Sequence, residues 1–255
     1  MDGGISRTGW QAVRRLLHRR GRQAAGALIV EGARAVSAAL SRPERVTTLL
    51  VGPEMTARSR TVWQEAVDAG LKIQALTPEQ SRALSGTAHS QDIFSVVRWS
   101  PQSGLPSPVA PFHLHVSGVR DPSNLGALLR SAAAFAVPVT CSKDCADVTH
   151  PVAVRAGVAS YFDLPLGIDV ALADLTGAAN HTVVRATAHG GTPLPDFAWP
   201  ERTILVIGGE AGGATEAHKP DVEVTIPAQI ESLNTAVAAG ILLWDARSKA
   251  VQKGI

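Results

Sequence analysis

Aromatic residues and cysteine are scarce in this chain. It has one tyrosine, five phenylalanines, five tryptophans and two cysteines among 255 residues. Two cysteines cannot form the framework of a disulfide-rich secreted domain. Cys141 and Cys145 with His150 would give three candidate zinc ligands, one fewer than a structural zinc site needs. We therefore expect ordinary thiols and no metal.

Long apolar runs and nucleotide-binding glycine patterns are also missing. No apolar run approaches the roughly 18 residues of a membrane span, and Met1 is not followed by a charged and then apolar leader. The spacings GxGxxG and GxxxxGKS/T are absent, which argues against a dinucleotide or P-loop site. We expect a cytoplasmic protein without a membrane partner, and a nucleotide-dependent oxidoreductase has little support.

The composition is that of a globular protein, with 45% hydrophobic and 18% charged residues. Strand-like and helix-like segments alternate in two blocks, residues 1–100 and 112–255, separated by the Pro- and Ser-rich segment 101–111, which we interpret as a linker. In the second block this alternation predicts a parallel sheet covered on both faces. The expected helices are 10–19, 33–40, 59–69, 78–84, 124–135, 151–160 and one starting near residue 233, and the expected strands include 27–30, 46–51, 72–76, 93–99, 112–119 and 137–142.

Basic residues concentrate in the first block. Residues 1–100 hold 14 lysines and arginines against 8 acidic residues, whereas residues 101–255 hold 10 against 14. A guanidinium group matches the geometry of phosphate, so a nucleic-acid backbone is a candidate partner, and a solvated helix face is the alternative. The candidate phosphate-binding residues of this cluster are Arg14, Arg15, Arg19, Arg20 and Arg22.

Two loops that follow predicted strands in the second block carry polar residues and glycine. The loop in residues 119–137 turns into a helix that carries Asn124 and Arg130. Ligands of open α/β sheets bind at the carboxyl ends of strands, so both side chains are candidates for a site. The alternative is that Asn124 caps the helix and Arg130 is a surface charge. The loop in residues 204–215 holds four glycines and Glu210, which alone is weak evidence for a ligand site.

A third loop leads into the last helix. After a short strand, Ser232 is expected to cap an apolar helix that begins near Leu233, with Asn234 in its first turn. Asn234 either assists the cap or bonds a ligand, because a buried amide needs hydrogen-bond partners. The small residues at 236–240 indicate a close-packed helix face.

In this order, the three loops resemble the sequence motifs of the SpoU (TrmH) family of RNA 2′-O-ribose methyltransferases, which belong to the knotted SPOUT class. The segment LIVEGARAV, residues 28–36, resembles the start of the L30e-like substrate-binding domain found in many members. The matching residues are Asp121, Asn124, Gly126, Ala127, Arg130, Ser131 and Ala132 in the first loop, Gly208, Glu210 and Gly213 in the second, and Ile226, Pro227, Glu231, Ser232, Leu233 and Asn234 in the third.

The resemblance implies a fold, a cofactor and partners. It implies an L30e-like α/β RNA substrate-binding domain at residues 1–100 and a SPOUT methyltransferase domain at residues 112–255. The second domain would contain a deep trefoil knot and a parallel sheet, bind S-adenosylmethionine and act as a homodimer. Ribosomal RNA is favoured as the substrate, and a transfer RNA 2′-O-methyltransferase and a non-catalytic RNA-binding module are the alternatives.

The resemblance also implies roles for single residues. Arg130 would act on the reacting ribose or its phosphate, and we prefer phosphate binding because a guanidinium group stays protonated. Asn124 would hold the ribose. The other catalytic candidates are Glu210, Ser232 and Asn234, the cofactor-binding candidates are Gly208, Gly209, Gly213, Ile226 and Leu233, and Arg155 is a further RNA-binding candidate with a surface charge as its alternative.

Overall fold

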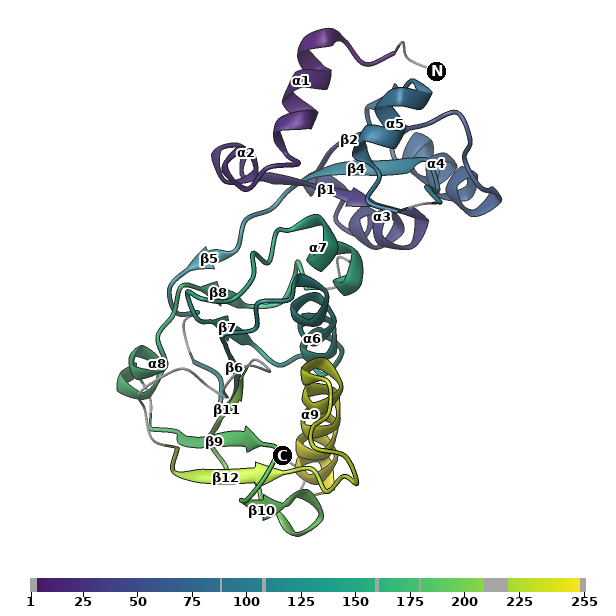
Figure 1. Ribbon diagram of the computed structural model, residues 1–255. Coiled ribbons are helices and arrows are strands. Elements are labelled where there is room, and N and C mark those ends of the chain that lie inside the picture. Colours follow the sequence, from purple (N-terminus) through teal and green to yellow (C-terminus); the bar gives the residue numbers. More distant parts are fainter. Residues whose placement is uncertain are drawn as a thin grey trace. The chain divides into compact units, whose positions relative to one another are not determined.

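The computed structural model describes residues 4–87, 89–106, 109–158, 161–178, 180–208 and 220–252. The chain divides into two compact units (Figure 1). Unit 1 comprises Met1–Ser100 and Thr149–Phe162, and unit 2 comprises Pro101–Val148 and Asp163–Ile255. Residues 149–162, which the sequence placed in the second block, therefore belong to the first unit. The chain passes between the two units three times.

Unit 1 is built on a four-stranded mixed sheet in the order β1-β4-β2-β3. Strand β4 pairs antiparallel with β1 and β2, and β2 pairs parallel with β3. The strands are β1 (Ala27–Glu31), β2 (Val46–Val51), β3 (Ile73–Ala75) and β4 (Ile93–Arg98). The helices are α1 (Arg7–Arg15), α2 (Arg19–Ala25), α3 (Ala33–Leu40), the 3-10 helix η1 (Pro43–Arg45), α4 (Ala57–Asp68), α5 (Pro78–Leu84) and α7 (Pro151–Gly157).

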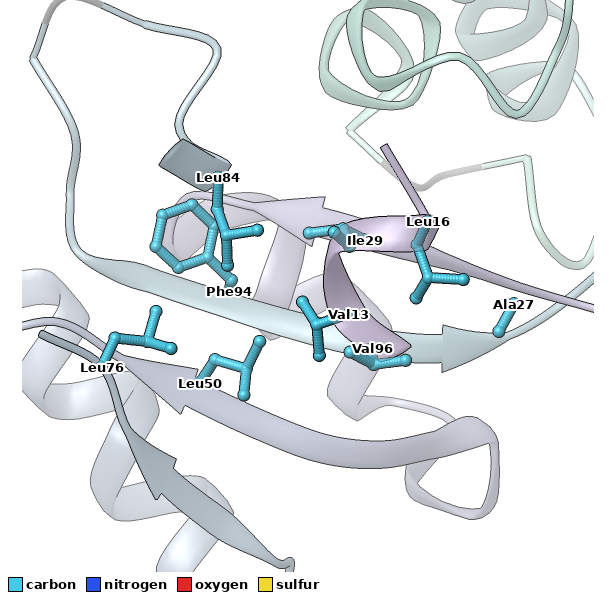
Figure 2. Close-up of a cluster of buried hydrophobic side chains, with 9 residues drawn as sticks. All are labelled: Val13, Leu16, Ala27, Ile29, Leu50, Leu76, Leu84, Phe94 and Val96. Carbon is cyan, nitrogen blue, oxygen red and sulfur yellow. The ribbon is translucent and has the colours of Figure 1, made fainter. Parts of the chain in front are cut away.

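The core of unit 1 lies between the sheet and helix α1. Val13 and Leu16 are three residues apart, so they share one face of α1, and both are buried against the sheet (Figure 2). Successive strand residues point to opposite faces, so Ile29 faces this cluster and Leu28 faces helix α3 on the other side. The cluster consists of Val13, Leu16, Ala27, Ile29, Leu50, Leu76, Leu84, Phe94 and Val96.

The basic segment near the N-terminus forms two helices where the sequence predicted one. Helix α1 starts after Ser6, whose side chain accepts a hydrogen bond from the Gly9 amide, and ends at Arg15. The chain then turns and α2 starts at Arg19. The prediction of one helix at 10–19 is therefore wrong at both ends, because α1 begins at Arg7 and ends at Arg15.

Unit 2 is built on an eight-stranded sheet in the order β10-β12-β9-β11-β6-β7-β8-β5. Every pairing described in it is parallel, which confirms the predicted parallel sheet. Strand β5 lies in the expected linker, so part of that segment is an edge strand. The strands are β5 (Gln102–Ser103), β6 (Phe112–Ser117), β7 (Val139–Cys141), β8 (Leu166–Ile168), β9 (Thr182–Thr187), β10 (Thr192–Pro193), β11 (Thr203–Gly208) and β12 (Val222–Thr225).

Helices cover both faces of the unit 2 sheet. Its helices are α6 (Pro122–Ala134), α8 (Leu172–Ala178), the 3-10 helix η2 (Leu194–Asp196) and α9 (Thr235–Gln252). Helices α6 and α9 lie side by side (Figure 1), and a Cβ added to Gly240 of α9 would lie 3.6 Å from Ser131 Oγ of α6. Ala239 and Gly240 of the small-residue segment thus pack within the chain, whereas Val237 is exposed. On the other face, Leu172 and Leu175 of α8 pack against Val206 of β11.

Two buried histidines lie on the central strand β6. His113 Nε2 and His115 Nδ1 lie 3.1 Å and 2.9 Å from the same hydroxyl, Thr140 Oγ1, and both side chains are 0% exposed. Burial, followed by repulsion from His115 and His181, lowers the pKa of His113 to about 3. The His113 ring is therefore neutral in the folded protein at ordinary pH.

Candidate functional site

The three sequence motifs follow strands β6, β11 and β12, whose carboxyl ends lie at the same edge of the sheet. Strand β6 lies beside β11, β11 beside β9, and β9 beside β12. In a parallel sheet the carboxyl ends of all strands meet at one edge, which is where open α/β sheets bind ligands. Helices α6 and α9 both start there, after β6 and β12.

The start of helix α6 is held by Asp121. Its carboxylate Oδ1 accepts a hydrogen bond from the Asn124 amide at 2.7 Å, and Pro122 occupies the first helical position. Both features are typical of a helix N-terminus. The alternative interpretation, in which the Asn124 side chain caps the start of the helix, is therefore wrong, because Asp121 is the cap.

The start of helix α9 is held by Asn234. Its side-chain oxygen Oδ1 accepts hydrogen bonds from the amides of Ala236 at 3.0 Å and Val237 at 3.3 Å. The expectation that Ser232 caps a helix beginning near Leu233 is wrong, because the helix begins at Thr235. Ser232 lies exposed in the turn that precedes the helix.

A hydrogen bond joins the two helix starts. Asn234 Nδ2 donates to Asn124 Oδ1 at 2.8 Å, across 110 residues of sequence. The backbone fixes the direction of this bond, because two amide N–H groups require the oxygen of Asn234 and leave its nitrogen facing Asn124. Asn124 therefore accepts through its oxygen, so its nitrogen Nδ2 provides the donor side of the group.

A cavity of about 480 Å³ lies beside the start of helix α9. Leu233 and Thr235, the two neighbours of Asn234, are in its wall. Three of the five cofactor-binding candidates are also there, namely Gly208, Ile226 and Leu233. The described wall consists of Arg185, Ala186, Thr187, Ala188, His189, Ile207, Gly208, Glu223, Val224, Ile226, Ala228, Ile230, Glu231, Ser232, Leu233, Thr235, Ala238 and Leu242.

Part of the predicted site lies outside the described residues. Gly209, Glu210 and Gly213 belong to residues 209–219, of which nothing is described. Ser232, by contrast, is described and lines the cavity.

The end of strand β9 contributes a wall that the sequence analysis missed. Residues 185–189, from Arg185 to His189, line the cavity together with the motif residues. A signal was present in the sequence, because this strand also runs into polar residues and then two glycines, Gly190 and Gly191. Both glycines have a positive φ, of 76° and 75°, a backbone conformation that other residues adopt rarely.

Arg130 lies exposed on helix α6, outside the described wall of the cavity. It is six residues from Asn124, which places it about 9 Å further along the helix and on a different face. The structure therefore leaves the Arg130 guanidinium at the surface, where it can meet a phosphate group of a large ligand.

The arginines proposed to bind RNA fall into two groups. Arg14, Arg15, Arg19 and Arg20 are exposed on α1 and α2 and form a basic surface of unit 1. Arg22 is only 4% exposed. Its Nη1 donates to the carbonyls of Leu16 at 3.1 Å and Leu17 at 3.0 Å, and its Nε donates to Thr149 Oγ1 at 2.9 Å. The expectation that Arg22 faces RNA is therefore wrong, since its guanidinium is used inside the unit.

Arg155 is neither a plain surface charge nor fully buried. Its Nη1 lies 2.9 Å from Glu31 Oε2 in an ion pair whose side chains are 30% and 11% exposed. The pair ties helix α7 to strand β1 within unit 1.

The described residues also bear on the metal and thiol expectations. Cys141 and Cys145 are free, and in the described parts of the chain no three His, Cys, Asp or Glu residues gather as metal ligands would. The hydrogen bond from Cys141 lowers the pKa of the Cys145 thiol to about 6. Within the same residues, no helix has the length and apolar character needed to cross a membrane.

Two protein families match the sequence. Residues 111–244, more than half of the chain, match the SpoU rRNA methylase family. Residues 11–95 match the MRM3-like substrate binding domain. The two matches fall on the two blocks of the sequence.

Similar proteins of established or named activity cover nearly the whole chain. The 23S rRNA (guanosine(2553)-2′-O)-methyltransferase RlmP of Bacillus subtilis is 28% identical over 226 residues, which are 86% of this chain and 88% of the relative. The 23S rRNA (uridine(2479)-2′-O)-methyltransferase of Streptomyces viridochromogenes is 29% identical over 255 residues, or 93% of this chain and 87% of the relative.

A solved structure agrees with the fold. The SpoU methyltransferase AviRb from Streptomyces viridochromogenes, in complex with the cofactor AdoMet, superposes with a TM-score of 0.79 at 26% sequence identity. The similarity covers 95% of this chain and 97% of the AviRb chain. The whole architecture, and not one domain alone, is therefore shared.

Proposed function

The chain belongs to the SpoU rRNA methylase family, and we propose that it transfers a methyl group from S-adenosylmethionine to the 2′-hydroxyl of a ribose in ribosomal RNA. The observation that carries this proposal is the Asn124–Asn234 hydrogen bond beside a cavity lined by Gly208, Ile226 and Leu233. The hydrogen bond joins the first motif to the third, and the third lines the cavity. The two named relatives act on 23S ribosomal RNA, which favours ribosomal over transfer RNA.

The cavity suits S-adenosylmethionine. Its volume of about 480 Å³ is within the range of roughly 300–1,000 Å³ typical of small-molecule sites. Ile226, Leu233 and Leu242 offer apolar contacts, and the hydroxyls of Thr187 and Ser232 lie in the same wall. When bound, the cofactor supplies an electrophilic methyl group on its sulfonium. We assign Gly209 and Gly213 to the same site by their place in the second motif.

The chain must hold and activate a weak nucleophile. A ribose hydroxyl reacts only when it is aligned with the methyl group and relieved of its proton. We assign Asn124 to the ribose by its place in the first motif. It is not the proton acceptor, because an amide is not a base and its oxygen already accepts a bond from Asn234.

Arg130 has a different part in this scheme. Its guanidinium stays protonated, so it binds the phosphate next to the reacting ribose and fixes the backbone of the RNA. Asn234 positions Asn124, and Ser232 shapes the cavity wall. We place Glu210 in the second motif loop at the same site.

Unit 1 would hold the rest of the RNA. Its residues 11–95 match a substrate-binding domain, and Arg14, Arg15, Arg19 and Arg20 form an exposed basic surface. Phosphate contacts of this kind give affinity without sequence preference.

We also propose that the protein is a homodimer with a knotted second unit. Val237 and Trp244 of α9 are 52% and 60% exposed, and their spacing of seven residues puts them on one helix face. A second copy of the chain would cover this apolar face. Light scattering on the wild type and on Trp244→Lys tests the dimer. A wild type that elutes as a monomer would overturn it.

The activity is tested with methyl-labelled S-adenosylmethionine and, separately, total ribosomal RNA and total transfer RNA. Label should enter ribosomal RNA and make the phosphodiester 3′ to the methylated nucleotide resistant to alkali. Arg130→Ala should lose at least about 100-fold of this rate, an effect of roughly 3 kcal/mol on the barrier. Arg202→Ala, which removes an exposed arginine just before β11, at the edge of the sheet opposite the motif loops, is the matched control and should retain the rate. Label in transfer RNA alone would overturn the substrate, and no label with no cofactor binding would overturn the activity.

A further inference from the structure

Unit 1 contains a second cavity of about 190 Å³. Three segments form its wall, namely the β1–α3 junction, the loop before β4 and helix α7. Its ionisable side chains are Arg34, His89, Arg155 and Glu31. The described wall consists of Glu31, Gly32, Arg34, Ala35, Thr87, His89, Gln91, Arg155 and Val158.

The one acidic group of that wall has its charge compensated locally. Glu31 Oε1 accepts hydrogen bonds from Ser85 Oγ at 2.6 Å and Thr87 Oγ1 at 3.3 Å. Its Oε2 accepts from the Gly86 amide at 3.1 Å and from Arg155 Nη1 at 2.9 Å. With four donors around it, the carboxylate serves to hold the loop and Arg155 in place. Its charge and that of Arg155 balance one another, so the net positive charge of the described wall comes from Arg34, and Arg155 contributes hydrogen-bond donors.

Gly86 fits closely against Arg155. A Cβ added to Gly86 would lie 2.6 Å from Arg155 Nη1 and 3.4 Å from its Cζ. Because contacts below 3.0 Å do not occur for real Cβ atoms, any larger residue would displace the guanidinium. The glycine is thus needed for space, and its φ is not in the positive range.

The start of helix α3 adds to the positive character of the same wall. Gly32 is the N-cap, with φ 90°, and the Ala33 amide donates to Gln91 Oε1 at 2.8 Å. The first turn of a helix carries a partial positive charge. Arg34, in that turn, is exposed and extends the cationic side of the cavity.

We propose that this cavity binds a backbone phosphate of the RNA substrate, held by Arg34 and Arg155 with His89 as a further donor. Guanidinium groups match phosphate oxygens, and a histidine ring donates one hydrogen bond when neutral and two when charged. A phosphate is favoured over an unstacked base, because base binding relies on aromatic platforms and His89 is the one aromatic ring in the described wall. The identity of the RNA rests on the proposed function.

The test measures binding of the full chain to a 23S ribosomal RNA transcript at several salt concentrations. Arg34→Ala should weaken binding about fivefold and lower the slope of log affinity against log salt by about one contact. Gly86→Ala should weaken it to a similar degree with every charge retained, because it moves Arg155. Arg60→Ala, which removes an exposed arginine of α4 away from the cavity, is the charge-matched control and should weaken binding less than twofold.

The inference is overturned if Arg34→Ala and Gly86→Ala bind RNA as Arg60→Ala does, or if the affinity of Arg34→Ala falls with no change in the salt slope. Thermal unfolding of each variant is measured alongside. Arg34 is exposed, so its variant keeps the test valid even if Gly86→Ala unfolds.

Methyl transfer by the wild type separates this inference from the proposed function. If the wild type transfers methyl groups but the two cavity variants bind RNA as the wild type does, the phosphate site is contradicted and the proposed function is supported. If the wild type transfers no methyl group to any RNA but the two cavity variants bind RNA more weakly, as expected, the proposed function is contradicted and the phosphate site is supported.

Discussion

Two buried charged side chains of unit 1 differ in use from the exposed motif residues of unit 2. In unit 1, Asp92 and Arg22 are 6% and 4% exposed and bind segments of the unit to one another. In unit 2, the motif residues Ser232 and Asn234 are exposed near the start of α9, and Arg130 is exposed further along α6. Arg22 and Asp92 therefore have structural roles inside unit 1, whereas Arg130 of the first motif is exposed and Asp121 of the same motif caps α6. A basic or acidic residue in the sequence does not reveal which use it has.

The largest expected effect is on the free energy of unfolding and tests the structural role of Asp92. Asp92 Oδ2 accepts from the Glu54 amide at 2.7 Å and Oδ1 accepts from Ser81 Oγ. Asp92→Ala leaves the buried Ser81 hydroxyl and the part-buried Glu54 amide without this partner, so the free energy of unfolding should fall by about 3 kcal/mol. Urea unfolding followed by tryptophan fluorescence measures it. The exposed Asp68→Ala on α4 is the control. A loss below about 1 kcal/mol would show that Asp92 is not structural.

The next effect separates two neighbouring arginines. Arg22→Ala removes a buried guanidinium that bonds Leu16, Leu17 and Thr149, so stability should fall by about 2 kcal/mol. Arg20→Ala should leave stability within about 0.5 kcal/mol and weaken RNA binding. Equal stabilities of the two variants would contradict the contrast between buried and exposed arginines.

A pH effect tests the neutral polar core of unit 2. The pKa of His113 falls from an ordinary 6.5 to about 3 on folding. Between these values the unfolded chain binds a proton that the folded chain does not, so stability falls as the pH falls. The slope from this group is at most about 1.4 kcal/mol per pH unit.

The measurement compares urea unfolding of the wild type and His113→Gln between pH 7 and pH 5. Glutamine retains a polar group for Thr140 but does not titrate, so the variant should lose less stability over this interval. Identical pH profiles would show that His113 is not the group responsible.

The smallest expected effect is on the catalytic efficiency of methyl transfer and tests whether Asn234 positions Asn124. Asp caps a helix as well as Asn does, so Asn234→Asp should keep the thermal midpoint. It has no N–H for Asn124 Oδ1, so the donor side of Asn124 is no longer fixed. The catalytic efficiency of methyl transfer should fall about fivefold, or about 1 kcal/mol. Unchanged activity, or a loss that follows the loss of stability, would contradict a positioning role.

Some helices and strands were predicted from the local sequence with their observed limits, and others were not. The strand at 46–51 and the helices at 33–40 and 78–84 were predicted with the observed limits, because their apolar periods and flanking turn residues are clear. The start of α9 was placed wrongly, because Ser232 and Asn234 are both good caps and the choice depends on the contact with Asn124. The short strands β5, β8 and β10 carry no period, so pairing with neighbouring strands defines them.

The sequence by itself determined the family, the parallel sheet of unit 2 and the motif residues, because apolar periodicity and motif spacing are local properties of the chain. The tertiary structure decided which residues meet. It joined Asn124 to Asn234, added the end of β9 to the cavity, buried Arg22 and placed residues 149–162 in unit 1. These outcomes depend on contacts between segments far apart in the chain, and no local pattern encodes them.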